Sequence, residues 1–281
     1  MAALRDFWRR YRRNKGAVVG LVVLAAILLV AAFGPVIYPG NPWDMAGAPF
    51  QPPFGAENPL GTDTLGRDVA TGIVHGARVS LLIGFVATLA AVGVGVCVGA
   101  VAGYFGGRVD DLIMRLTEFF QTIPSFVFAV VLVAIFTPGI GSIVTAIAVV
   151  SWPAVARLVR GEFLSLRTRE FVQASIVLGR SARHIIFVEI LPNAISPIIV
   201  SASLMVATAI LVESSLSFLG LGDPNMMSWG YMIGASRSVV RLAWWTSFFP
   251  GLAIVLTVLA LNLVGEGLSD ALNPRLSREG R

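Results

Sequence analysis

The feature that most constrains this chain is a series of long stretches without a single charged residue. Five of them lie along the 281 residues, at positions 16–43, 79–107, 119–156, 190–212 and 242–265. A helix needs about 20 predominantly apolar residues to cross the hydrocarbon core of a bilayer. Four stretches therefore hold one such helix each, whereas 119–156 holds two, split by the turn-forming run Thr137-Pro138-Gly139-Ile140-Gly141-Ser142. We expect an all-α polytopic membrane protein with six transmembrane helices.

Composition supports this fold class and excludes an ordinary soluble domain. Hydrophobic residues make up 56% of the chain and charged residues 13%, with a mean hydropathy of +0.81. A soluble domain has roughly twice that charged fraction. The uncharged stretch 16–43 is much longer than the apolar core of a signal peptide, about 7–15 residues, so we expect a retained first helix. The one cysteine, Cys97, lies within an apolar stretch and is interpreted as a small apolar side chain.

The distribution of basic residues predicts the orientation. Six spans place both termini on one side, and the segments on that side hold seventeen Lys and Arg residues, against four on the other side. Under the positive-inside rule, both termini are cytoplasmic. We expect one transmembrane domain over 1–281, with cytoplasmic segments 1–15, 157–189 and 266–281 and extracytoplasmic segments 39–77 and 213–241. The basic residues form no groove-sized patch, so no nucleic-acid partner is expected.

Motifs for catalysis by the chain itself are missing from the sequence. A phosphate-binding loop needs a lysine beside glycines, and the single lysine, Lys15, leads directly into the first apolar stretch. The two histidines, His75 and His184, fall on opposite sides of the predicted membrane. We therefore expect no catalytic residue, metal or cofactor, and any ATP chemistry has to come from a partner. An intramembrane enzyme is disfavoured for the same reason.

The segment 157–189 contains a short amphipathic helix, predicted over Thr168–Leu178. Its apolar residues at i, i+3 and i+7 share one face: Phe171, Ala174 and Leu178. Gly179 suits the left-handed residue that ends a helix, and Ser181 suits the cap of the next helix. On chemistry alone, this helix either lies on the lipid surface or docks against a partner.

The same segment resembles the cytoplasmic loop of ATP-binding-cassette (ABC) importer permeases. That pattern is E-A-A, three residues, G, nine residues, then I-x-L-P. This chain has Gln173-Ala174-Ser175, Gly179 and Leu191-Pro192 at the matching positions. Three positions depart: Gln173 replaces Glu, Ser175 replaces Ala, and Glu189 replaces Ile.

Further landmarks resemble the second, C-type permease subunit of dipeptide and oligopeptide importers. They run in order along most of the chain: Leu60–Asp68, Gly76–Leu81, Gly103–Gly107, Leu216–Gly222 and Asn262–Leu268. Nickel and glutathione importers are similar at these landmarks, so the solute stays open between peptides and those alternatives.

The resemblance implies a type I ABC importer permease fold in a bacterial plasma (inner) membrane. It implies alternating access driven by partner ATPases, with four partners: a related second permease, two cytoplasmic ATP-binding subunits and an extracytoplasmic substrate-binding protein. It also implies that one ATPase receives the coupling-loop residues Phe171, Gln173, Ala174, Ser175, Leu178 and Gly179.

Charged residues of the first outer segment have two interpretations. Asp63, Arg67 and Asp68 either contact the binding protein or cap and fix an interfacial helix. The second explanation is the simpler one, with Thr62 or Asp63 as the N-cap.

Few ionisable residues lie near the predicted spans. Glu213 closes the fifth span and is either a functional group or plainly solvated. Glu118, beside Arg115, is expected to form an ion pair. A self-sufficient secondary transporter would need paired or relayed ionisable residues deep in the spans, and the predicted spans contain none.

Overall fold

The computed structural model describes residues 2–272, and the described chain is helical apart from its connections. Most of the predicted tail 266–281 lies outside the described residues. The elements are α1 (Ala2–Tyr11), α2 (Lys15–Ile37), α3 (Val69–Phe105), α4 (Gly107–Thr122), α5 (Ser125–Ile135), α6 (Ile140–Arg167), α7 (Glu170–Val177), α8 (Ala182–His184), the π-helix η1 (Ile185–Ile190), α9 (Leu191–Phe218), α10 (Trp229–Ser236) and α11 (Trp245–Leu272).

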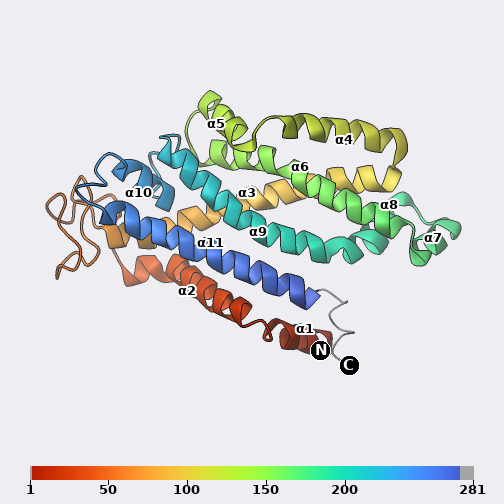
Figure 1. Ribbon diagram of the computed structural model, residues 1–281, viewed down its shortest axis with the longest axis horizontal. Coiled ribbons are helices and arrows are strands. Elements are labelled where there is room, and N and C mark those ends of the chain that lie inside the picture. The colour runs from red at the N-terminus through yellow and green to blue at the C-terminus, as the bar shows by residue number, and fades with distance from the viewer. Residues whose placement is uncertain (1, 273–281) are drawn as a thin grey trace.

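The long helices run side by side along the longest axis of the molecule (Figure 1). One end, called here the α7 end, holds α1, α7 and α8. The opposite end, the α10 end, holds α10 and the connection between α2 and α3. Within the described residues, the only β-type pairing is two isolated bridges in that connection, Met45 with Arg67 and Thr62 with Asp68.

Six membrane spans are confirmed when one bent pair is counted as a single span. Five helices are long and apolar enough to cross a bilayer: Lys15–Gly34, Val69–Phe105, Ile140–Arg167, Ala182–Phe218 and Trp245–Leu272. The sixth span is α4 with α5, which meet at an angle of 82°. Pro124 lies at the bend, as the N-cap of α5. A proline has no backbone N–H to donate to a preceding helical carbonyl, so the bend falls where no helical hydrogen bond has to be broken. The predicted turn is present between α5 and α6, but it is shorter than 137–142, because α6 already begins at Ile140.

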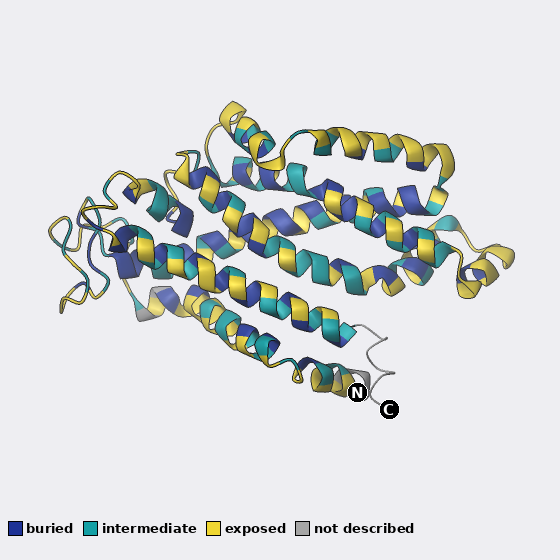
Figure 2. Cartoon of the chain, viewed as in Figure 1, coloured by how far each residue is buried: buried dark blue, intermediate teal, exposed yellow. Residues whose placement is uncertain are grey.

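The third span begins earlier than the uncharged stretch that predicted it. We expected its start near Phe119, but α4 begins at Gly107, directly after α3. The charged residues between these positions lie on a helix that is exposed along most of its length (Figure 2). Other helices also extend beyond their uncharged stretches. The helix α3 has 37 residues and is therefore about 55 Å long at 1.5 Å per residue. The hydrocarbon core of a bilayer is only about 30 Å thick.

Close backbone approach between α3 and α6 organises the centre of the bundle. Gly95, Gly99 and Gly103, spaced four residues apart on α3, all face α6. A Cβ atom at Gly103 would lie only 2.6 Å from Cβ of Phe163, so a larger residue would force the helices apart. Small residues at such spacing allow helices to pack tightly in membranes, where van der Waals contact replaces the hydrophobic effect. This contact fixes the position of α6, which leads to α7.

Candidate functional site

The helix α7 ends in the way the sequence predicts. Gly179 has φ of 71°, in the left-handed region. Its N–H donates to the carbonyl of Ile176 at 3.0 Å, and the N–H of Arg180 donates to the carbonyl of Ser175 at 3.1 Å. This pair of bonds is the Schellman motif, which satisfies the last carbonyls of a helix. The predicted cap at Ser181 is also confirmed, since its Oγ accepts the N–H of His184 at 3.3 Å.

The apolar face predicted for this helix points away from the rest of the chain. Phe171 is 40% exposed and Leu178 75%, and Ala174 is exposed as well. Val177, 86% exposed, lies on the same side. We call these four residues the α7 arc. A contiguous apolar surface left uncovered in this way marks a contact with a protein or a lipid.

The opposite face of α7 is anchored in the bundle. Val172 is fully buried in a cluster with Phe163 of α6 and with Ile185, Ile186 and Ile190 of η1. Because η1 continues directly into α9, this cluster connects α7 to two of the membrane spans. The apolar periodicity did not identify Val172, because this residue follows Phe171 directly in the sequence and therefore lies on a different face of the helix.

A polar contact fixes the same face. Ser175, which is buried, donates from Oγ to Oε1 of Glu189 in η1 at 3.1 Å. The Nε2 atom of His184 lies 3.8 Å from that oxygen. Ser175 and Glu189 are two of the three positions that depart from the loop pattern. The third, Gln173, donates from Nε2 to the carbonyl of Arg167 at 2.8 Å.

At the α10 end, Asp68 rather than Thr62 or Asp63 is the N-cap of α3. Its carboxylate accepts the N–H groups of Ala70 and Thr71 at 3.2 and 2.9 Å and the hydroxyl of Thr71 at 2.6 Å. The predicted cap was misplaced because the helix starts at the residue immediately after Asp68, well beyond Thr62.

Asp63 stabilises the turn that precedes this cap. Its Oδ1 accepts the N–H groups of Leu65 at 2.8 Å and Arg67 at 2.9 Å. The guanidinium carbon of Arg67 lies 4.7 Å from the centre of the Trp43 ring, a cation–π distance. The two carboxylates therefore hold this segment in shape.

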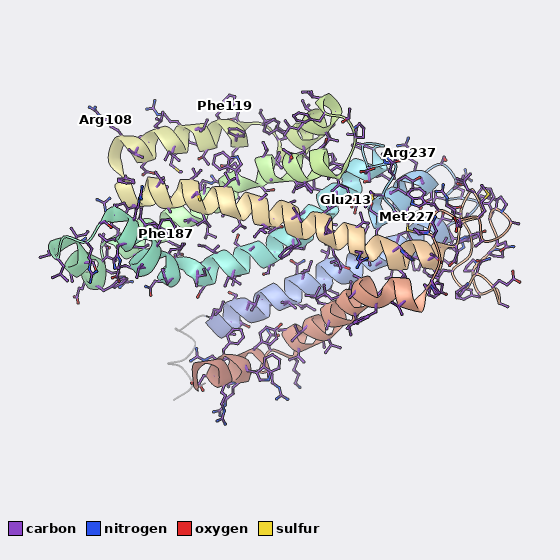
Figure 3. The ribbon with its side chains drawn as sticks, turned by 180° about the vertical axis from the view of Figure 1, so that it is seen from behind. Arg108, Phe119, Phe187, Glu213, Met227 and Arg237 are labelled. Atoms are coloured by element: carbon purple, nitrogen blue, oxygen red, sulfur yellow. The ribbon has the colours of Figure 1, made fainter. Side chains whose placement is uncertain are left out.

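Glu213 is buried rather than solvated. It is 1% exposed, and its Oε1 accepts hydroxyl protons from Ser217 at 2.9 Å and from Ser228 at 2.7 Å. Ser228 also caps α10 by accepting the N–H of Tyr231 at 2.9 Å. Glu213 thus ties the end of α9 to the start of α10, near Met227 in Figure 3. Within the described residues, no basic side chain pairs with it.

A charge pair joins α4 to α6. Arg160 donates from Nε and Nη2 to the two carboxylate oxygens of Asp110 at 2.5 and 2.6 Å. The pair expected between Glu118 and Arg115 is not among the salt bridges of the described residues, so that prediction is wrong. Asp110 and Arg160 both lie outside the uncharged stretches, on parts of α4 and α6 that extend beyond the predicted spans.

Two family models together match most of the chain. Residues 95–278 match the binding-protein-dependent transport system inner membrane component, and residues 3–53 match the N-terminal TM domain of oligopeptide transport permease C. The chain belongs to this family of transport permeases. The predicted resemblance is therefore confirmed, including its C-type assignment.

Relatives of the permease match it over nearly full length. The dipeptide transport system permease protein DppC of Escherichia coli K12 is 44% identical, covering 99% of this chain and 95% of the relative. The di/tripeptide permease DppC of Pseudomonas aeruginosa is 41% identical, with 97% and 92% covered. The oligopeptide permease OppC of Haemophilus influenzae is 39% identical, with 96% and 88% covered.

A solved structure supports the predicted fold. An inward-facing conformation of the MetNI methionine ABC transporter aligns with a TM-score of 0.61 at 17% identity, covering 72% of this chain and 96% of that chain. At that identity the likeness concerns the fold, which is that of a type I importer permease.

The structure does not bring all the predicted site residues of the permease together. The coupling-loop residues lie at the α7 end, whereas Asp63, Arg67, Asp68 and Glu213 lie at the α10 end. Two roles escaped prediction: the Ser175–Glu189 contact and the connection of Glu213 to α10. The only sequence signal for the first was that both residues depart from one pattern.

Proposed function

We propose that this permease is the membrane-spanning subunit of an importer that moves dipeptides and oligopeptides across a bacterial plasma membrane. Partner subunits hydrolyse ATP, and the spans give alternating access to the two sides. The α7 arc carries the proposal, because it presents apolar side chains from a helix whose other face is firmly anchored.

The geometry of α6 favours a protein partner for the arc over lipid. The uncharged stretch ends at Ala156, but α6 continues for eleven residues to Arg167. At 1.5 Å per residue this extension is about 16 Å. The headgroup layer on each side of a bilayer is only about 5–7 Å thick. The helix α7 therefore lies beyond the headgroups, at the level of a cytoplasmic protein.

The proposed assembly contains two ATP-binding subunits, a related second permease and a binding protein on the opposite side. One ATP-binding subunit receives the arc together with Gln173, Ser175 and Gly179. Peptides are favoured over nickel or glutathione, because relatives at 39–44% identity carry dipeptide or oligopeptide names. A secondary transporter is disfavoured, because its ionisable groups would have to form a relay. Glu213 lies near the last turn of α9, whereas Asp110 lies in the first turn of α4, and the two form no relay.

The proposed orientation places segments 1–15, 157–189 and 266–281 in the cytoplasm and 39–77 and 213–241 outside. With Cys97 replaced by Ala, we expect a Gly139→Cys variant to react with an impermeant maleimide in intact cells. Gly139 has extended backbone, so the cysteine fits without strain. An Arg180→Cys variant should react only after lysis. The opposite labelling pattern would reverse the orientation.

The docking role is tested by Gly179→Val. A β-branched residue at positive φ is strongly disfavoured, by roughly 1–2 kcal/mol, so the end of α7 should rearrange. We expect normal membrane insertion but a loss of most of the ATPase stimulation by substrate-loaded binding protein in the reconstituted complex. About 1.4 kcal/mol corresponds to a tenfold change in the population of the docking geometry.

Gly107→Val is the matched control. Gly107 also has positive φ, 54°, and open space around its Cβ position, and it is the first residue of α4. It should show similar strain with stimulation retained. Gly179→Asn should also retain stimulation, because asparagine tolerates the left-handed region. Wild-type stimulation in Gly179→Val would contradict docking.

A further inference from the structure

The N-terminal helix α1 is fixed to the α7 end of the bundle. Tyr11 is buried and donates its hydroxyl proton to the carbonyl of Ala17 at 3.1 Å. Phe7 packs against the same small cluster, which includes Ala271 of α11. Just beyond α1, Asn14 donates from Nδ2 to Asp270 at 2.9 Å. These contacts fix which face of α1 is turned away from the protein.

That outward face is strongly basic. Arg5 and Arg9 of α1 and Arg12 in the turn just after it lie at i, i+4 and i+7, and all three are exposed. Trp8, 45% exposed, stands between them and stacks on Tyr11 with ring centres 5.8 Å apart. The three arginines and Trp8, with Asp6, line an open hollow on the surface. Among the described residues, none of these arginines forms a salt bridge.

This basic face lies directly before the first membrane span in the sequence. The helix ends at Tyr11, and the uncharged stretch that enters the bilayer begins at Gly16. Arg12 and Arg9 therefore lie four and seven residues before the stretch that enters the bilayer, next to the headgroup layer, and Arg5 lies one helical turn further away. Basic amphipathic helices with a tryptophan bind at this depth, where arginines meet lipid phosphates and tryptophan lies at the headgroup level.

We propose that Arg5, Arg9, Arg12 and Trp8 form a binding surface for anionic phospholipid headgroups in the leaflet at the α7 end. The surface is independent of the ATPase-docking role, since it lies on another helix. Each basic residue near an anionic surface changes affinity by about fivefold. Removal of all three charges should therefore weaken binding on the order of a hundredfold.

The test measures phosphatidylglycerol binding to the purified full chain in mixed micelles, without ATPase subunits, by native mass spectrometry. The Arg5→Gln, Arg9→Gln, Arg12→Gln triple variant should lose most of its preference for phosphatidylglycerol over phosphatidylcholine. The corresponding lysine variant should keep most of it, because the attraction is one of charge. Retention by lysine also separates the effect from misfolding.

A matched control removes three exposed arginines from the same end but beyond the headgroups: Arg169, Arg180 and Arg183. Its lipid preference should equal that of the wild type. Equal loss in both triple variants, or no loss in the α1 variant, would overturn the proposal. Unchanged lipid binding with reduced ATPase co-purification would assign the surface to a protein partner instead.

Discussion

The contact between Ser175 and Glu189 offers a direct way to test how the coupling loop is held. Ser175→Ala and Glu189→Ile each restore the residue of the general loop pattern. The first change leaves the Glu189 carboxylate with the weaker neighbour His184, 3.8 Å away. The second leaves the Ser175 hydroxyl, in a residue that is 8% exposed, without an acceptor.

The expected magnitudes follow from the burial of the two groups. A hydrogen bond to a charged group contributes about 1.5–3 kcal/mol when buried. The Glu189 side chain is 29% exposed, so we expect Ser175→Ala to cost about 1–2 kcal/mol. Glu189→Ile should lower the stability by a similar amount, because it leaves the buried Ser175 hydroxyl without an acceptor. Replacing both partners with apolar groups is nearly neutral in general, and here the isoleucine would adjoin Ile185 and Ile186. The double variant should therefore recover most of the loss, with an interaction energy of about 1–2 kcal/mol.

The assay is a double-mutant cycle on the reconstituted importer. Thermal unfolding of the complex reports stability, and ATPase stimulation by substrate-loaded binding protein reports coupling. We expect each single variant to lose stimulation and the double variant to approach the wild type. The exposed Thr168→Ala variant serves as control and should change little. If the two single effects simply add within about 0.5 kcal/mol, the contact does not hold the loop.

Two further changes test polar contacts between helices. Glu213→Gln keeps an acceptor for Ser217 and Ser228 and should preserve thermal stability and transport. Glu213→Ala should lower both, because each stranded buried hydroxyl costs about 1–3 kcal/mol; equal losses would show that the charge itself matters. Asp110→Ala should destabilise the detergent-solubilised chain by about 1–3 kcal/mol in thermal unfolding, a range reduced for the partial exposure of Arg160. An exchange of Asp110 and Arg160 should recover part of that loss, and no recovery would argue against a direct pair.

The sequence predicted the number of spans because uncharged stretches report directly on contact with hydrocarbon. It misplaced the start of the third span for a physical reason. The first turns of α4 carry charges, and Asp110 is accommodated there because Arg160 of α6 neutralises it. A rule that reads one stretch at a time does not detect compensation from a helix 50 residues away.

In the coupling loop too, some features follow from the local sequence and others depend on distant parts of the chain. The left-handed conformation of Gly179 was predictable, since glycine is the residue that adopts it at least cost. Periodicity correctly grouped Phe171, Ala174 and Leu178 on one face, but it does not say whether a face is covered. Here the apolar arc is exposed and the face with Val172 is buried, because η1 and α6 supply the cover.

The helical span that follows the coupling loop connects the α7 end of the molecule with the α10 end. From Ala182 to Phe218 the chain forms one nearly continuous helical span of 37 residues. Its first turns hold α7 through Val172, and its last turns hold α10 through Glu213. The helix α10 is in turn fastened to α3, where the indole of Trp229 donates to the carbonyl of Ile73 at 2.9 Å. A single helix, rather than a chain of loops, therefore connects α7 to the α10 end. The π-helical turn of η1 lies where this helix meets the loop, and such turns often occur at functional sites. The alternating access proposed above, driven from the α7 end, requires this kind of continuity. We therefore expect Glu213→Ala and Ser175→Ala, which each remove a contact of this span, to affect the same transport step.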